Sequence, residues 1–151
     1  MTITFTAAEL QKIMRQMSHL EVQDIKDVEA RDNARAGLDK VEEVNRCLAH
    51  GFAQVRRRCW RWLDDDDTST KGRVYIQQGD TDYNLNLSER RGLDKAEALA
   101  SAMERLILEY ALSEFYSTVN QAELSKKHSI LALDASNELD ELLYTKKPPR
   151  V

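Results

Sequence analysis

The sequence predicts a mainly α-helical bundle with one long helix and an inserted two-stranded β-hairpin, folded as a single domain over residues 1–151. Only two prolines and five glycines occur, so regular elements are seldom interrupted. Between Leu20 and Leu63 there is no proline, and good helix formers dominate. Residues 73–87 instead alternate with a period of two around a glycine-containing turn, which is typical of a hairpin.

The first helix is expected to begin after Thr6. Thr6 and Glu9 have the spacing of a capping box, in which two side chains satisfy free N–H groups at a helix start. Ser18 and Glu21 form a second such pair, so we expect the chain to bend near His19 and to start a new helix. The apolar positions between the two boxes have helical spacing and are Leu10, Ile13, Met14 and Met17.

From Leu20 to Leu63 we expect one long helix or two nearly collinear ones. Its later part repeats apolar residues every 3.5 positions, as in a coiled-coil or bundle seam. The apolar residues upstream of the seam, Val22, Ile25 and Val28, are out of phase with its 3.5-residue repeat. We therefore expect a kink or loop near Arg31 to Arg35. The seam positions are Ala34, Leu38, Val41, Asn45, Leu48, Phe52, Val55, Cys59 and Trp62.

The sequence leaves three features of this seam open. Asn45 either is buried with a hydrogen-bonding partner or lies at the edge of the seam and bonds water. Gly37 and Gly51, unfavourable inside a helix, allow either a close helix approach or a bend. The seam itself can pack within one chain or between chains.

The acidic run 64–67 opposes the helix dipole and predicts the end of this helix. The hairpin follows, with arms at 74–77 and 83–87; because an isolated hairpin is marginal, we expect it to pack on the helices or on another subunit. Asp94 and Glu97 then start a helix to about Thr118, and a last helix runs from about Gln121 to Tyr144. A basic tail occupies residues 145–151.

The composition is that of a soluble globular chain. It is 32 % charged and 42 % hydrophobic, with a formal net charge of -4. No run of about 18 apolar residues occurs, which argues against a membrane-spanning helix. The first residues lack a basic region and an apolar core, so we expect no secretory signal.

The residues that could perform chemistry do not form a recognisable constellation. Cys47 and Cys59 would lie about 18 Å apart on one helix, which is too far for a disulfide, and we expect two buried reduced thiols. His50 lies three residues from Cys47 on the same predicted helix, so its ring could contact the Cys47 thiol. Cys59 lies on the apolar seam, where a thiol stays protonated and inert. His128 is expected to be a hydrogen-bonded core residue. We predict no catalytic residue, no cofactor and no bound metal.

The densest group of basic residues is an arginine cluster with a tryptophan between its members: Arg56, Arg57, Arg58 and Arg61, with Trp60. Arginines beside aromatic rings can bind phosphates or protein surfaces. The chain is acidic overall, so a solvated arginine face is favoured, followed by protein contacts and then by nucleic acid. The basic tail could order against an acidic groove on a neighbour. The candidate interaction residues are Arg56, Arg57, Arg58, Trp60, Arg61, Tyr83, Lys146, Lys147 and Arg150.

The second half of the chain resembles small structural proteins of tailed bacteriophages and prophages. The resemblance lies in the order of a hairpin ending in residues 83–88, Arg90 and Arg91, a helix carrying residues 110–116, a further helix and the basic tail. Such proteins look like helical adaptors, with a β-hairpin and an extended arm, that form rings at the head–tail junction.

This resemblance implies a non-enzymatic virion structural protein, self-associating or adaptor-like. Its partners would be copies of itself and other virion proteins, with no membrane and no small-molecule substrate. It would lie in the bacterial cytoplasm or in the virion. The alternative is a cytoplasmic helical binding or regulatory module that contacts nucleic acid through the arginine cluster.

Overall fold

The computed structural model describes residues 2–63, 82–88 and 96–144. Within these residues the chain is mainly helical with a small antiparallel sheet, which confirms the predicted fold class. The elements are β1 (Thr2–Phe5), α1 (Ala7–Gln23), α2 (Val28–Asp39), α3 (Val41–Arg58), the short 3-10 helix η1 (Trp60–Trp62), β2 (Tyr83–Asn86), α5 (Ala96–Thr118) and α6 (Ala122–Tyr144).

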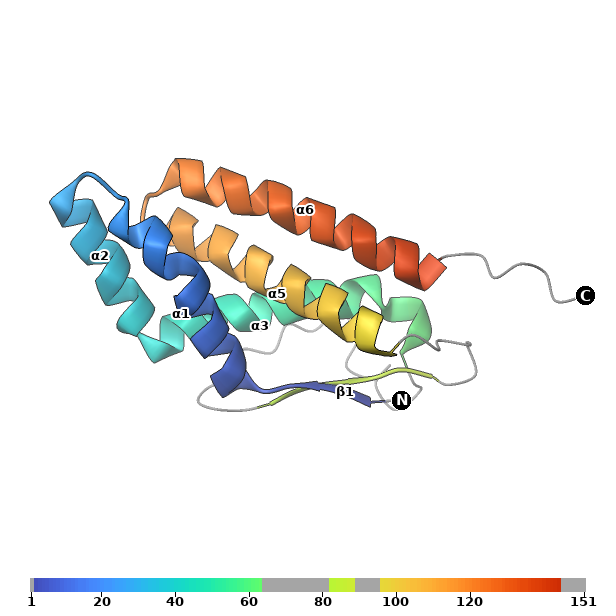
Figure 1. The fold of residues 1–151 in the computed structure, drawn as a ribbon. Helices are drawn as coiled ribbons and strands as arrows, with labels where there is room; N and C mark the ends of the chain where they lie inside the picture. The colour runs from blue at the N-terminus through green and yellow to red at the C-terminus, as the bar shows by residue number, and fades with distance from the viewer. Residues whose placement is uncertain (1, 64–81, 89–95, 145–151) are drawn as a thin grey trace, which may run out of the picture.

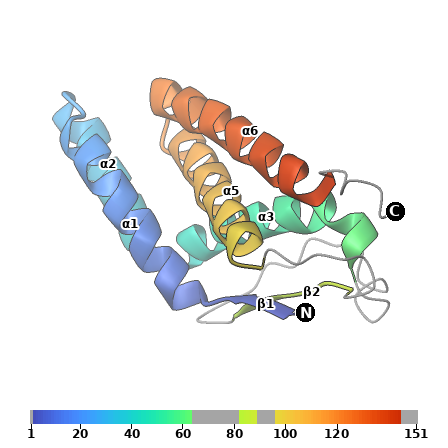
Figure 2. The same ribbon diagram turned by 45° about the vertical axis from the view of Figure 1, so that its right-hand side comes forward.

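The two longest helices, α5 and α6, have 23 residues each and pack side by side. They run antiparallel because the chain reverses between them at Asn120, which has a positive φ of 60°. Helix α3 lies against α5, and α1 and α2 form a further layer beside this group (Figures 1 and 2). The predicted end of α5 and both predicted bounds of α6 agree with those observed, whereas Asp94, the predicted start of the α5 capping box, lies outside the described residues.

The segment expected to be one long helix is divided between α1, α2 and α3. The predicted kink at 31–35 is wrong, because α2 runs unbroken through it. The chain breaks instead at 24–27, where the Asp27 carboxylate accepts a hydrogen bond from the Glu29 N–H, and at Lys40, whose backbone is extended. The predicted bend near His19 is also wrong. The Ser18 hydroxyl donates to the Met14 carbonyl, four residues back, and does not cap a new helix.

The sheet joins an N-terminal strand to a strand in the middle of the sequence. The strand predicted at 83–87 is present as β2, and its partner is β1, which we had not expected to be a strand. Thr2 and Thr4 donate side-chain hydrogen bonds at 2.8 Å to Asn86 and Asn84 on the outer face. The inner face lies on the helices, as expected of the hairpin. The other predicted arm, 74–77, lies outside the described residues.

The seam, which extends from α2 through α3 to η1, is buried within the chain apart from Val41, which is 44 % exposed, and Phe52, which is partly buried. Asn45 is buried and accepts a hydrogen bond from the Gln11 amide of α1, so the first of its two alternatives is correct. Gly51 allows a close approach of two helices: a Cβ there would lie 2.5 Å from the Ile107 carbonyl oxygen of α5.

Candidate functional site

The surface with the character of an interaction site lies where α3 and α6 end. After α3, the tight turn of η1 directs Trp62 inward and leaves Trp60 49 % exposed. Tyr144, the last residue of α6, is 50 % exposed, and its ring meets that of Trp62 edge-on at 4.5 Å. We call the surface formed by Trp60, Tyr144, Arg57, Arg58 and Arg61 the aromatic end.

Backbone and side-chain contacts hold the aromatic end in place. The Arg58 guanidinium donates to the Asp140 carboxylate at 2.7 Å, which ties the end of α3 to α6. The Ser88 N–H donates to the Trp62 carbonyl at 2.7 Å, and Leu63 forms an isolated antiparallel bridge with Leu87. The exposed groups are therefore attached to a fixed framework.

The structure separates the predicted interaction residues. Arg57, Arg58, Trp60 and Arg61 are each exposed, whereas Arg56 is half-buried. Tyr83 lies in the core instead, 1 % exposed, with its ring 5.2 Å from that of Phe52. It has to be removed from the surface candidates, because alternation along β2 turns it toward the helices. Lys146, Lys147 and Arg150 lie outside the described residues.

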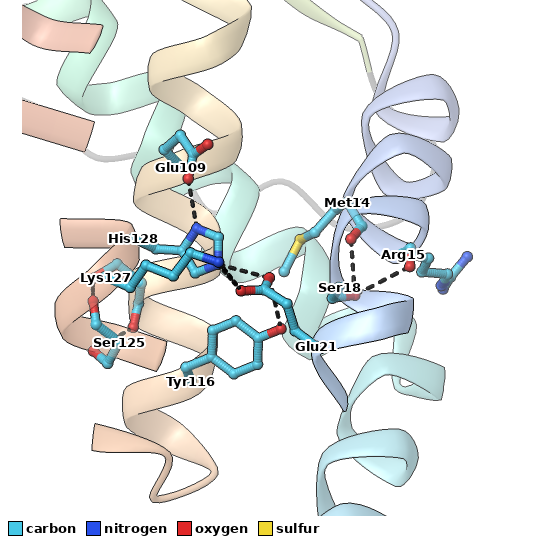
Figure 3. A network of polar contacts seen from close by, with 10 residues as sticks. Met14, Arg15, Ser18, Glu21, Glu109, Tyr116, Ser125, Lys127 and His128 are labelled. Carbon is cyan, nitrogen blue, oxygen red and sulfur yellow. Dashed lines mark hydrogen bonds and ion pairs between the residues drawn. The ribbon is translucent and has the colours of Figure 1, made fainter. Parts of the chain in front are cut away.

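A polar cluster lies between α1, α5 and α6, largely buried except for the exposed Lys127 (Figure 3). The His128 ring contacts Glu109 through Nδ1 at 2.6 Å and Glu21 through Nε2 at 2.8 Å. Lys127 Nζ lies 2.9 Å from the Glu21 carboxylate, and the Tyr116 hydroxyl donates to it at 3.4 Å. We call these five residues the histidine cluster. His128 is thus a hydrogen-bonded core residue, as predicted.

The electrostatics of the histidine cluster favour a positively charged imidazole. Burial lowers the pKa of His128, but the hydrogen bonds and charges of Glu109 and Glu21 outweigh burial and raise it overall. Burial likewise raises the pKa of Glu21, but Lys127 and His128 together hold it below its usual value. A protonated ring donates through both nitrogens, so each carboxylate accepts a charge-assisted hydrogen bond.

The histidine cluster connects three helices. Both ring nitrogens of His128 contact carboxylates of the chain itself, Nδ1 that of Glu109 on α5 and Nε2 that of Glu21 on α1. Sequence reasoning placed Glu21 only in a capping box and did not select Glu109. The available signal was a glutamate inside the apolar stretch 106–112 of α5, where a charged side chain requires a partner.

The cysteines are buried and free, as predicted. Burial raises the pKa of Cys47 and of Cys59 to about 12, so both thiols stay protonated near neutral pH. His50 contacts the Glu114 carboxylate at 2.6 Å through Nδ1. Residues 2–63, 82–88 and 96–144 contain no group of three or more His, Cys, Asp or Glu placed to hold a metal.

Known proteins offer no match to this chain. Scans of family models, of curated proteins and of solved structures all return nothing similar. Among the described helices, none combines the length and the apolar character needed to cross a bilayer. The aromatic end therefore has to be interpreted from its own chemistry.

Proposed function

We propose that this chain is a non-enzymatic structural protein that works by association with copies of itself or with neighbouring subunits. The observation that carries the proposal is the aromatic end, where Trp60 and Tyr144 stay half exposed beside three arginines. Trp, Tyr and Arg are the residue types most enriched where protein interfaces have their binding energy.

The exposed rings have a physical reason to be covered. A Trp or Tyr side chain buries about 150–250 Å² when fully enclosed, and roughly half of that remains in water here. A partner that covered both rings would remove this area from water, which stabilises the complex. Because Arg58, Ser88 and Trp62 hold the backbone in place, little ordering entropy would be lost on binding.

The more specific form of the proposal is a virion structural protein of a tailed bacteriophage or prophage, self-associating or adaptor-like, at a place such as the head–tail junction. Its support is the resemblance in the order of parts. A helical body with a small sheet, present in the structure, is compatible with such an adaptor. Gene neighbourhood tests this form directly: a position between portal and tail genes would favour it, and a metabolic operon would contradict it.

The association is tested by sedimentation velocity of the full chain over a wide concentration range. We expect oligomers whose fraction falls in Trp60→Ala, because that change removes an exposed ring without opening the core. Leu20→Ala is the matched control, since Leu20 is a 68 % exposed apolar residue on α1. A chain that stays monomeric, or oligomers indifferent to Trp60→Ala, would contradict the role of this surface.

The alternative function, a regulatory module that contacts nucleic acid, rests on the same arginines. Arg57 and Arg61 are exposed, while Arg58 is already paired with Asp140. Titration with duplex DNA at several salt concentrations separates the two functions. Binding that weakens steeply with salt and is lost in Arg57→Ala with Arg61→Ala would favour the alternative.

A further inference from the structure

Within the histidine cluster, Glu21 is the residue that joins the end of α1 to α6, and its contact with His128 is the buried part of that joint. The Glu21 side chain is 15 % exposed and that of His128 is 4 % exposed. Lys127 also contacts Glu21, but its side chain is 57 % exposed, and an exposed ion pair contributes little. The polar contact between these two helices therefore depends mainly on the Nε2 atom of His128.

The charged and titratable groups that face His128 come from all three helices of the cluster (Figure 3). Glu21 of α1 lies at Nε2 and Glu109 of α5 lies at Nδ1. Tyr116 of α5 stacks on the imidazole, with ring centroids 5.4 Å apart and planes 22° apart. Burial raises the pKa of the Tyr116 hydroxyl, so it stays neutral near neutral pH. Lys127 of α6 itself contacts the Glu21 carboxylate.

A neutral imidazole can donate to one of the two carboxylates but not to both, because it has a single N–H group. The two carboxylates differ in the partners that they would keep. His128 is the one donor that the described residues offer to the side chain of Glu109, which is 9 % exposed. Glu21 would keep Lys127 and the Tyr116 hydroxyl. Since a buried carboxylate without a partner is strongly unfavourable, the proton on Nε2 leaves and Nδ1 keeps its proton for Glu109.

We propose that the histidine cluster is a pH-sensitive switch, in which loss of the Nε2 proton of His128 loosens the C-terminal end of α1 from α6 while Glu109 keeps α5 joined to α6. Without its proton, Nε2 would present a lone pair to the two Glu21 oxygens that lie 2.8 and 3.0 Å from it. The Glu21 carboxylate then has to move away. The switch does not depend on the proposed association, because all of its groups lie within one chain.

The fold confines this response to the end of α1. Nearer its start, α1 is bound to α3 through Gln11 and to α2 through Arg15. Helices α5 and α6 pack on each other along their lengths (Figure 1). The segment that loses a contact is therefore 18–23, together with the turn at 24–27. Val22 is 2 % exposed and still packs on the core, so the response is more frequent local opening of this segment.

The switch opens as pH rises. Burial lowers the pKa of His128, but the hydrogen bonds and charges of Glu109 and Glu21 raise it above the ordinary value of 6.5, so the opening falls above that pH. The contact is complete below that value and is lost as pH rises through the folded pKa. Glu21 stays ionised over the same range, because Lys127 and His128 hold its pKa below 4.5 despite its burial.

Nuclear magnetic resonance of the ring nitrogens tests which proton leaves. In the full chain at about pH 6, we expect both nitrogens of His128 to carry a proton. Above the transition, Nδ1 alone should keep one. A neutral ring protonated on Nε2, or a ring that stays charged until the whole chain unfolds, would overturn the switch.

Hydrogen exchange followed by mass spectrometry tests the opening itself. After correction for the intrinsic pH dependence of exchange, the amides of 18–23 should exchange about tenfold faster above the transition, the effect of losing one hydrogen bond between charged groups. Those of α5 and α6 should keep their protection. An unchanged rate in 18–23, or a loss of protection spread over all helices, would contradict a local switch.

Two variants separate the switch from a merely structural contact. In Glu21→Gln the side-chain amide can accept from a protonated Nε2 and donate to a bare one, so exchange of 18–23 should lose its pH step. His19→Gln is the matched control, because it removes an exposed imidazole from the same end of α1 and should leave the step intact. A step that persists in Glu21→Gln, or that disappears in His19→Gln, would overturn the assignment to His128.

Discussion

The histidine cluster permits a stability prediction whose magnitude follows from burial. His128→Gln removes the positive charge that both carboxylates use. The side chain of Glu109 is 9 % exposed, that of Glu21 is 15 % exposed, and Glu21 keeps Lys127 as a partner. Most of the loss should therefore come from Glu109. Removing one member of a buried ion pair costs about 3–5 kcal/mol, and we expect a loss of that size near pH 6.

Urea denaturation followed by far-ultraviolet circular dichroism measures this loss as a change in the free energy of unfolding. The double variant Glu109→Gln with His128→Gln is the control. It removes the stranded carboxylate, so it should be more stable than His128→Gln alone. A loss below about 1 kcal/mol in His128→Gln, or a double variant whose loss is the sum of the single losses, would refute the ion-pair account.

The same cluster predicts the pH range in which it stabilises the fold. His128 has a raised folded pKa, so its contribution is complete below the unfolded value near 6.5 and is lost as pH rises through the folded value. Glu21 has a lowered folded pKa, so its contribution is complete above about 4.5 and is lost as pH falls through the folded value. The stability difference between wild type and His128→Gln should be largest between about pH 4.5 and 6.5. A difference independent of pH would contradict the assigned charges.

The remaining predictions concern the packing of α3. Gly51→Ala should cost about 1–3 kcal/mol in urea denaturation, because its Cβ would meet backbone of α5, which cannot rotate away; an unchanged midpoint would contradict the close approach. Asn45→Ala should cost about 1–3 kcal/mol because it strands the buried Gln11 amide, and Gln11→Met in the same chain should recover part of that loss. Cys47 and Cys59 should react with a thiol reagent only at the rate of unfolding; rapid labelling of the folded chain would contradict their burial.

Local patterns predicted most of the elements but not β1, and long-range contacts decided how the elements are divided and paired. The 3.5-residue period located the buried side of α3 because that period is a property of one helix. The same composition concealed two breaks, since Asp27 and Lys40 interrupt the helix without proline or glycine. Likewise, Ser18 and Glu21 have capping-box spacing, yet the Ser18 hydroxyl bonds the Met14 carbonyl of its own helix and Glu21 faces His128, which only the tertiary fold brings near.

The candidate site was predictable to a similar degree. The arginine cluster and Trp60 were found from composition and adjacency along α3. Tyr144 joins them only because α6 ends beside Trp62, which no spacing in the sequence records. Tyr83 was misplaced although the alternation along β2 already puts it on the same face as Leu85 and Leu87, the face that is buried.

Polar contacts at three points along α1 fix its position on the bundle. Gln11 bonds Asn45 of α3, Arg15 donates to the Leu38 carbonyl of α2 at 3.2 Å, and Glu21 meets His128 of α6. Apolar packing alone tolerates a helix sliding by a turn, because Leu10 and Met14 could exchange neighbours at modest cost. Each polar contact would be broken by such a slide and would leave a buried group unpaired. The proposed association would benefit from this constraint, since α1 carries β1, and β1 holds the strand whose extension to Ser88 anchors Trp62 at the aromatic end.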